Sequence, residues 1–464
     1  MAEATECSKN KYEVDMTQGP ILRHLVFFSV TVAATSLLQL LYNMVDTIVV
    51  GQFAGKEALA AVGSTGSLIN LLITLFVGLS VGASITLARY YGEGDNKAVS
   101  DTAHTAIALS VICGLFVGVF GFMATKPLLE AMGVPDDIID LATLYMKLYF
   151  VSIPFSFINV FGSAVLRAVG DTKRPLYILI VSGLLNVALN LIFVIIFHMS
   201  VAGVALGTVF SSVLSAGLVL RVLTHTGGAI RIILKKLRIK KSALRAIARI
   251  GLPAGLEGAT FGISNVLIQA AVNSFGSLVV AGNSVAISIM GLVNMTISSI
   301  NQACMTFTSQ NIGARQYRRV RRSPLITIGL VTVCNVAMCQ LILAFASPIA
   351  SLFNSDAGVI HYAVLRMGYT FPLYFTFGIM QTFTSQLRGM GHSFLPMAVS
   401  ITGISGIRLT WLYTAFAANP TLKVLYTGYP VSWITTMMII IVCYLVIIRK
   451  VPKTDLELPC QADA

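Results

Sequence analysis

Two carboxylates of this chain lie inside long apolar stretches of sequence, where an ionisable group requires a specific reason. Asp46 lies five residues before Gly51, and Glu257 lies four residues after Pro253. The other acids among the nineteen fall in the termini, in loops or at the ends of apolar stretches. A carboxylate at the centre of a bilayer costs about 2.5–3.5 kcal/mol on insertion scales, so such a residue usually faces a partner or a water-filled cavity. Both acids are therefore candidate functional residues.

The functional hypothesis for Asp46 is a carboxylate that alternately holds a coupling cation or proton and a cationic substrate. At 1.5 Å of helix per residue, Asp46 lies roughly 7 Å inside the outer end of the first apolar stretch. An acid solvated by the outer water, or a structural hydrogen bond to a neighbouring helix, is the alternative.

Asn186 and Asn190 are four residues apart and therefore share one face of a helix. Together with Asp46 they offer oxygens suited to a hard cation such as Na⁺, with Asp46 and Asn190 as its ligands, or a hydrogen-bond cage for a protonated carboxyl. A single negative charge weakens the case for tight Na⁺ binding and leaves proton coupling open. Interhelical hydrogen bonding, worth about 0.6 kcal/mol on average in membranes, is the alternative role of the two asparagines.

Arg408 lies in the middle of an apolar stretch, and a buried arginine needs an anion. Glu257 is the intramembrane acid of the same half of the chain, so a structural Glu257–Arg408 pair is the favoured prediction. A role of Glu257 in binding substrate or cation is the alternative. Lys147 and Arg366 occupy matching places near the outer ends of two stretches, where snorkelling to the lipid headgroups accounts for both without a role in gating.

Further polar and flexible side chains in the apolar stretches are candidates for lining a cavity. Met and aromatic side chains form adaptable walls in promiscuous sites, and amides bind polar groups or join helices. The candidates are Gln39, Tyr42, Asn43, Gln269, Asn273 and Met290. Plain packing is the alternative for each of them.

Composition indicates what kind of protein positions these residues. Of the 464 residues, 56% are hydrophobic and 11% are charged, whereas soluble domains carry about 25% charged residues. A membrane-spanning helix needs roughly 20 mainly apolar residues. The sequence predicts an all-α integral membrane protein with twelve such helices, at about 22–50, 57–82, 101–125, 138–163, 176–198, 202–224, 248–273, 281–307, 325–348, 358–385, 397–417 and 429–448.

The charges of the loops predict how these helices are oriented. With twelve spans, 26 of the 32 lysines and arginines lie on the side that holds both termini, and three lie in the opposite loops. The positive-inside rule therefore places both termini in the cytoplasm. The segment 225–249 is basic and apolar, and we expect it to lie on the cytoplasmic membrane face, drawn to anionic lipid rather than to nucleic acid.

The chain repeats itself at an offset of 221 residues. The loop 166–175 matches the loop 387–396, and Gly92 matches Gly313. Six helices in each half make the repeats parallel, as in transporters that consist of two lobes. The predicted division is a cytoplasmic tail at 1–20, an N-lobe at 21–224, a basic linker at 225–247, a C-lobe at 248–448 and a cytoplasmic tail at 449–464.

Several motifs, in order along the chain, resemble the multidrug and toxic compound extrusion (MATE) family. They are Val45-Asp46-Thr47 followed by Gly51, the alanine-rich segment 58–63, the Leu-Arg-x-x-Gly loops that begin at Leu166 and Leu387, and the segment Gly251–Glu257. The similarity runs from about residue 17 to residue 450. It implies the MATE fold of the MOP superfamily.

The resemblance also implies roles for particular residues. An acid at the position of Asp46 is central to coupling in the family, and a pair like Asn186 and Asn190, with Asn or Asp at the later position, lies across from it. One branch of the family uses an acid at the position of Glu257 for a cation route, together with an Asp on the tenth helix. This chain has no acid in residues 370–375 of that helix, so a sodium site in the second lobe is doubtful.

The function that the resemblance implies is secondary active multidrug efflux. Amphipathic organic cations, such as drugs or dyes, would be exchanged for H⁺ or Na⁺ by alternating access of the two lobes in the bacterial cytoplasmic (inner) membrane. No cofactor, enzymatic activity, nucleic acid or ATPase subunit is expected, and the chain lacks a P-loop pattern. The alternatives are a lipid or lipid-linked oligosaccharide flippase of the same superfamily, for which Arg408 is an argument, and a membrane sensor or structural protein without transport.

Overall fold

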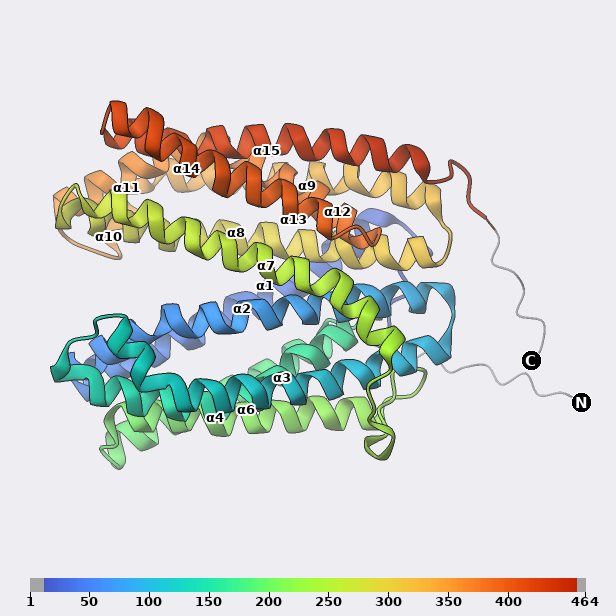
Figure 1. The fold of residues 1–464 in the computed structure, drawn as a ribbon, viewed down its shortest axis with the longest axis horizontal. Coiled ribbons are helices and arrows are strands. Elements are labelled where there is room, and N and C mark those ends of the chain that lie inside the picture. Colours follow the sequence, from blue (N-terminus) through green and yellow to red (C-terminus); the bar gives the residue numbers. More distant parts are fainter. Residues whose placement is uncertain (1–11, 457–464) are drawn as a thin grey trace, which may run out of the picture. The chain divides into compact units, whose positions relative to one another are not determined.

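The computed structural model describes residues 12–456, and every regular element in that range is a helix (Figure 1). The first half contains α1 (Ile21–Val49), η1 (Val50–Ala54), α2 (Lys56–Glu93), α3 (Asn96–Ala131), α4 (Asp136–Ala168), α5 (Lys173–Leu191), η2 (Ile192–Ile196), α6 (Ser200–His225) and η3 (Leu234–Lys236). The second half contains α7 (Lys241–Asn273), α8 (Ser277–Gly313), α9 (Tyr317–Ala344), α10 (Ala346–Ser351), α11 (Ala357–Thr370), η4 (Phe371–Leu373), α12 (Tyr374–Gly389), α13 (Phe394–Ser400), η5 (Ile401–Gly406), α14 (Ile407–Trp411), η6 (Leu412–Phe416) and α15 (Leu422–Lys450).

The predicted all-α membrane fold is confirmed, and each of the twelve predicted stretches falls on helix. Ten helices of the described chain are long and apolar enough to cross a membrane. The two other stretches lie on α7, which carries Arg249 and Glu257, and on the run α11–η4–α12. Pro372 lies in the 3₁₀ turn η4, which divides this second run into the two shorter helices α11 and α12.

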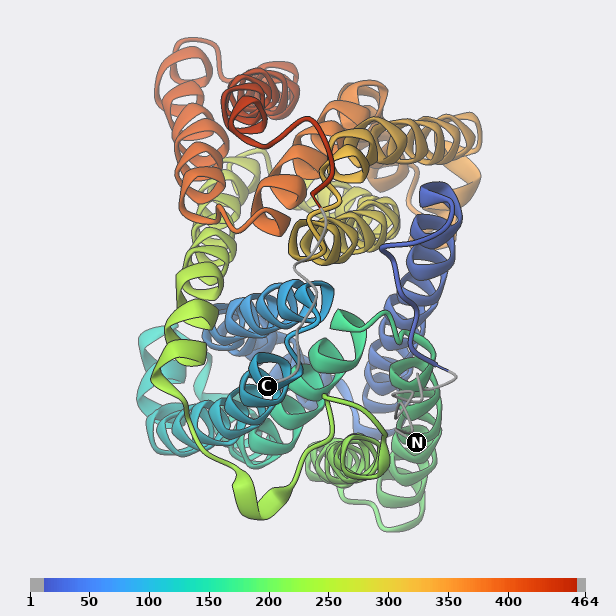
Figure 2. The ribbon, with the colours of Figure 1, turned by 90° about the vertical axis from the view of Figure 1, so that its right-hand side faces the viewer.

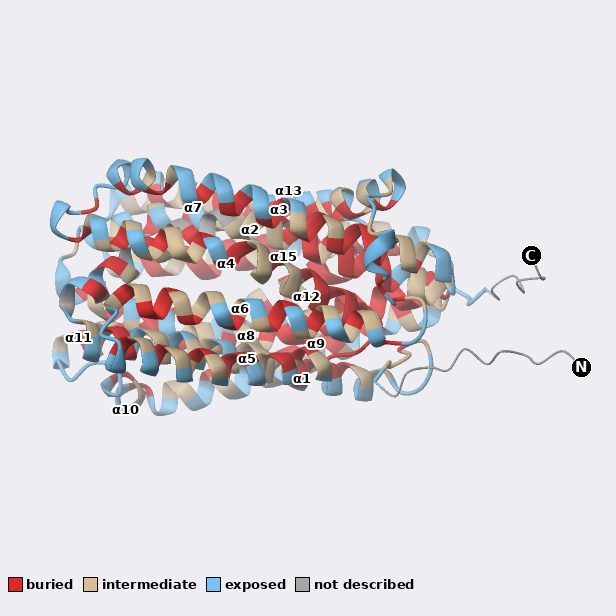
Figure 3. Ribbon diagram, turned by 90° about the horizontal axis from the view of Figure 1, so that it is seen from below, coloured by how far each residue is buried: buried red, intermediate tan, exposed pale blue. Residues whose placement is uncertain are grey.

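The outer faces of the helices are apolar, as a lipid environment requires. Ile112, Phe116, Val119 and Met123 recur on one face of α3, and their exposed fractions are 53%, 62%, 57% and 76%. Such a stripe of large apolar side chains would be unfavourable in water. In Figure 3 the buried and the exposed residues alternate along the helices in the same way, with the buried residues turned toward neighbouring helices.

The described chain divides into two compact units. The first unit contains residues 12–15 and Ala34–Gly255, and the second contains Met16–Ala33 and residues 256–456. Figures 1 and 2 show α3, α4 and α6 side by side in the first unit, where they enclose most of its apolar core. A smaller core in the second unit is formed mainly by α8, α11 and α15.

This division differs from the expected lobes 21–224 and 248–448 at both ends. The first half of α1 belongs to the second unit because Leu25, Phe28 and Val32 pack against Ala303 and Phe307 of α8. The sequence had no means of showing this, because α1 is one uninterrupted helix and its apolar residues do not reveal which neighbours they contact.

The first part of α7 likewise belongs to the first unit, through four glycines. A β-carbon at Gly78 of α2 would lie 2.3 Å from the backbone nitrogen of Gly255, and one at Gly82 would lie 2.3 Å from the carbonyl oxygen of Ile247. A β-carbon at Gly251 would lie 2.6 Å from the α-carbon of Leu79. Small residues four apart on two helices permit this close backbone approach, which is a common basis of helix association in membranes.

The basic linker packs on the first unit. Ile230 and Ile232 are buried, the backbone nitrogen of Ile233 donates to Nε2 of His104 at 3.0 Å, and Lys240 forms an ion pair with Asp101. Helix α7 begins at Lys241, so the last residues of the predicted linker are helical. The position of the linker on the membrane surface stays a prediction.

Candidate functional site

The first unit brings Asp46, Asn190 and Asn186 together. Nδ2 of Asn190 donates to Oδ1 of Asp46 at 2.5 Å and lies 3.2 Å from Oδ1 of Asn186. Nδ2 of Asn186 in turn donates to the hydroxyl of Ser211 at 3.4 Å, and Ser211 donates to the carbonyl oxygen of Thr208 at 3.0 Å. Asn190 therefore donates both to the carboxylate and to Asn186, whereas Asn186 donates away from the carboxylate to Ser211.

Burial fixes the orientation of the two amides. Asn190 is fully buried and Asn186 is 7% exposed, whereas Asp46 is half-buried. A buried amide gains little from water, so its orientation is set by the partners around it. The two amides thus form a fixed wall beside a carboxylate that remains accessible.

Gly207 of α6 makes room for this wall. A β-carbon at position 207 would lie 2.0 Å from Oδ1 of Asn190, so any larger residue would displace the amide. That amide oxygen has no hydrogen-bond partner in the described structure, although it is buried. The glycine therefore fixes the position of Asn190, and the sequence alone gave no signal of this contact.

Three tyrosines lie on the helices near Asp46. Tyr42, one helical turn before Asp46, lies on Gly183 of α5, where a β-carbon would be 2.0 Å from its ring. Its hydroxyl donates to the carbonyl oxygen of Ile180 at 3.4 Å. Tyr145 and Tyr149 of α4 lie within electrostatic range of Asp46, and their ring centroids are 6.2 Å apart. The spacing of four residues in this last pair was a signal that sequence analysis missed.

The helices that carry Asp46 and Asn190 both continue into π-helical segments. Segment η1 begins four residues after Asp46, and η2 begins two residues after Asn190. Short π-helical segments within α-helices occur frequently at functional sites. Their positions here mark the same region as the hydrogen bonds do.

The described hydrogen bonds of Asp46 do not include the other predicted cavity residues, and a role of these residues in lining a cavity stays a prediction. Gln39 and Asn43 are exposed on α1. Gln269 and Asn273 bond to each other in the second unit, where Nδ2 of Asn283 donates to Oε1 of Gln269 at 2.9 Å. Met290 is partly buried and packs against the apolar core of that unit.

The predicted pair of Glu257 with Arg408 is wrong. Glu257 forms its ion pair with Arg388, which follows Leu387 in the repeated loop motif. The Glu257 side chain is 6% exposed and that of Arg388 is 17% exposed, so the pair is largely withdrawn from water. Arg388 lies in the last turn of α12 and not in a loop, so its side chain can reach a buried acid.

Arg408 instead lies over aromatic rings. Its guanidinium carbon is 4.5 Å from the ring centroid of Tyr429 and 5.9 Å from that of Trp433, and its Nε donates to Oγ of Ser432 at 3.0 Å. A guanidinium over an aromatic face is stabilised by the quadrupole of the ring.

The prediction that Arg366 snorkels to the outer headgroups is also wrong. Arg366 is 3% exposed, donates to Oδ1 of Asn283 and lies 5.3 Å from the ring centroid of Tyr429. Lys147 is half-buried, with Nζ 5.4 Å from the ring centroid of Phe122, and its role stays a prediction.

Residues 12–456 bring together no group of three or more His, Cys, Asp or Glu side chains that could hold a metal ion. Any cation at Asp46 would therefore rest on one carboxylate and on amide or hydroxyl oxygens.

Comparison with known proteins decides the family. The MatE family profile matches residues 32–192 and 253–414, which together are more than half of the chain. The chain belongs to the MatE family. As a member of this family it is a membrane-embedded, multi-pass transporter and not an enzyme.

The individual relatives of this MatE protein share less than a third of its residues. The probable multidrug resistance protein YoeA of Bacillus subtilis (strain 168) is 27% identical over 447 residues, which are 94% of this chain and 96% of that protein. The probable multidrug resistance protein YpnP of the same organism is 29% identical over 315 residues, 66% of this chain and 68% of that protein. A solved outward-facing structure of a multidrug resistance MATE family transporter of the MOP superfamily has a TM-score of 0.89 at 23% identity, covering 96% of this chain and all of that chain. This likeness shows that the fold is shared.

Proposed function

We propose that this MatE protein exports amphipathic organic cations in exchange for protons, with Asp46 as the site where the two compete. The observation that supports this proposal is the direction of the hydrogen bond at Asp46: the amide N–H of Asn190, and not its oxygen, faces the carboxylate. The names of relatives such as YoeA support small organic compounds as the cargo.

The orientation of the two amides disfavours a sodium ion at Asp46. A hard cation binds oxygen ligands. The oxygen of Asn186 already accepts from Asn190, and the oxygen of Asn190 faces Gly207. A sodium ion at Asp46 would therefore find one carboxylate and no amide oxygen turned toward it, whereas a proton requires only the carboxylate.

Exchange follows from competition for a single negative charge. A proton on Asp46 neutralises the carboxylate and removes the attraction for a cationic drug, and the drug binds again when the proton leaves. Export of one positive charge against 100 mV costs about 2.3 kcal/mol, and an incoming proton offsets this electrical work. The distribution of basic residues supports a placement of both termini in the cytoplasm.

Dye transport in vesicles tests this proposal. The purified protein is reconstituted into liposomes, and efflux of ethidium is followed after an imposed proton gradient and, separately, after an imposed sodium gradient in buffers of equal ionic strength. We expect efflux with the proton gradient, loss of efflux in Asp46→Asn, and normal efflux in Asp137→Asn, an exposed acid on α4 that receives the same substitution.

Two results would contradict the proposal. Full ethidium efflux by Asp46→Asn would remove Asp46 from the mechanism. Absence of ethidium efflux together with translocation of a fluorescent phospholipid across the same vesicles would instead favour the lipid flippase.

A further inference from the structure

Two buried arginines of the second unit share one tyrosine. Arg366 of α11 and Arg408 of α14 are 3% and 6% exposed, and their guanidinium carbons lie 5.3 Å and 4.5 Å from the ring centroid of Tyr429. Their positive charges repel each other at this separation. Neither the transport of cations nor the exchange at Asp46 makes use of them.

The carboxylates of the second unit are occupied elsewhere. Among its described residues these are Glu257, Asp356 and Asp455. Glu257 is paired with Arg388, Asp356 accepts from the backbone nitrogens of Gly358 and Val359 at the start of α11, and Asp455 accepts from the backbone nitrogen of Arg318. The partners that the described structure gives to the two arginines are neutral: asparagine, serine and tyrosine groups and aromatic faces.

These neutral partners leave hydrogen-bonding capacity unused. Nε of Arg366 is buried and has no acceptor in the described structure. Tyr429 accepts at its hydroxyl from Arg366 at 3.4 Å, and Arg408 uses Nε on Ser432. Two buried cations with spare donors and no carboxylate leave a net positive charge inside the bundle, and an anion is the group that neutralises such a charge.

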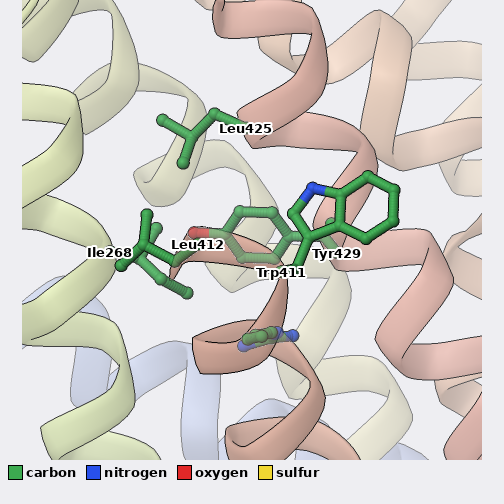
Figure 4. A pocket seen from close by; sticks show the side chains of 7 residues that line it. Ile268, Trp411, Leu412, Leu425 and Tyr429 are labelled. Carbon is green, nitrogen blue, oxygen red and sulfur yellow. The ribbon is translucent and has the colours of Figure 1, made fainter. Parts of the chain in front are cut away.

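A small cavity lies beside Arg408. It has a volume of about 10 Å³, and Arg408 and Tyr429 line it together with apolar side chains. Figure 4 shows Ile268, Leu412 and Leu425 around the hydroxyl end of Tyr429. A volume of this size holds about one water-sized particle, which is too little for the carboxylate group of a larger substrate.

The backbone around this cavity is irregular. Helix α14, which carries Arg408, has five residues and lies between the π-helical segments η5 and η6. Tyr426, Tyr429 and Trp433 of α15 recur at a spacing of three and four residues, so they turn one aromatic face toward the two arginines. Arg408 and Tyr429 thus bring a guanidinium and a hydroxyl group to the edge of a place with room for one small particle.

We propose that the second unit binds a monovalent anion of halide size, such as chloride, in the cavity beside Arg408 and Tyr429. The bound anion balances the charges of Arg408 and Arg366 and holds α11, α14 and α15 together. This site is separate from Asp46, which lies in the first unit.

The two tryptophans of the chain report on the proposed site directly. Trp411 lines the cavity, and the ring of Trp433 is 5.9 Å from the guanidinium of Arg408. Bromide is close to chloride in size and quenches indole fluorescence through the heavy-atom effect. The experiment titrates the purified full-length protein with sodium bromide, while sodium gluconate keeps the ionic strength constant.

We expect quenching that saturates, that chloride reverses, and that gluconate does not affect. In Arg408→Gln the bromide concentration at half-maximal quenching should rise by about tenfold or more, which is the scale expected when a charge-assisted contact is lost. Arg408→Lys keeps the charge and should retain saturable quenching. Chloride should also raise the Tm of the wild-type protein relative to gluconate, which is a measurement that needs no variant.

Three results would overturn the proposal. The first is quenching of the wild-type protein that rises linearly with bromide and never saturates. The second is saturable quenching that is unchanged in an Arg408→Gln protein with the wild-type elution volume. The third is reversal of quenching by benzoate but not by chloride, which would assign the arginines to a carboxylate of the cargo.

Discussion

Gly207 and Asn190 are in contact across two helices, with position 207 facing the amide oxygen of Asn190 at a distance that admits no β-carbon. The amide nitrogen of the same side chain donates to Asp46, which precedes it by 144 residues. A glycine on α6 therefore determines how an asparagine on α5 meets a carboxylate on α1. The first prediction follows from this relationship.

Gly207→Ala should impair coupling without altering any polar group. The new methyl group would lie 2.0 Å from the amide oxygen, so Asn190 must move away from Asp46. Loss of a hydrogen bond to a charged group costs about 1.5–3 kcal/mol, which corresponds to about a tenfold to hundredfold change in the affinity of Asp46 for its cations. The measurement is ethidium efflux at a series of imposed pH gradients.

Gly217→Ala is the matched control for this variant. Gly217 lies on the same helix, and a β-carbon there would have no neighbour within 4 Å. This control should transport normally and be slightly more stable, since alanine is favoured over glycine in a helix by about 0.5–1 kcal/mol. Equal efflux by the two variants would show that the Gly207 contact is irrelevant to coupling.

Asn190→Asp should add sodium dependence to the transport. The substitution places a second carboxylate beside Asp46 and replaces an N–H donor by an oxygen, which supplies the oxygen ligands that a hard cation requires. We expect ethidium efflux by this variant in response to a sodium gradient, measured against choline as the replacement cation. If the variant responded to protons alone, as the wild type is proposed to do, the direction of the amide would not determine ion choice.

Glu257→Gln should destabilise the protein, and removal of its partner should reverse the effect. Breaking one side of a buried ion pair leaves an uncompensated charge and costs about 3–5 kcal/mol. Arg388 would carry that uncompensated charge, because Glu257 is its ion-pair partner. Its Nε already lacks an acceptor in the described structure. The double variant Glu257→Gln/Arg388→Met should regain thermal stability and also ethidium efflux, which identifies the pair as structural. A double variant that is stable but does not transport would assign Glu257 a direct part in transport.

Gln386→Leu should lower the Tm of the second unit. Gln386 is fully buried, its Oε1 accepts from Thr308 at 2.6 Å and from Ser323 at 3.3 Å, and its Nε2 donates to the carbonyl oxygen of Val320 at 2.9 Å. Leucine would leave the Thr308 hydroxyl without its acceptor, at about 1–3 kcal/mol for an unsatisfied group, whereas Ser323 keeps its hydrogen bond to the carbonyl oxygen of Val320 at 3.1 Å. Gln381→Leu, a half-buried position on the same helix, should have a much smaller effect. Equal shifts in Tm for the two variants would refute the importance of this network.

The sequence by itself determined the class of the protein and the first members of its site. Low charge and repeated apolar stretches require a membrane environment, because each such stretch must bury its side chains in lipid or in other helices. Asp46, Asn186 and Asn190 could be found because polar residues inside apolar stretches are visible in the sequence and are costly to bury in a membrane. The spacing of four residues also places the two asparagines on one helix face, and the structure shows that they contact each other.

The tertiary structure decided which residues are partners. Glu257 meets Arg388, and not Arg408, although 131 residues separate the two members of the pair. Gly207 joins the site through helix packing that leaves no mark on its own segment of sequence. The spacing of Tyr145 and Tyr149 gives them a shared helix face, but it does not show which neighbour that face meets. Periodicity gives the face of a helix on which a residue lies, but the neighbour of that face depends on how side chains of distant segments fill space, and this is a property of the whole fold.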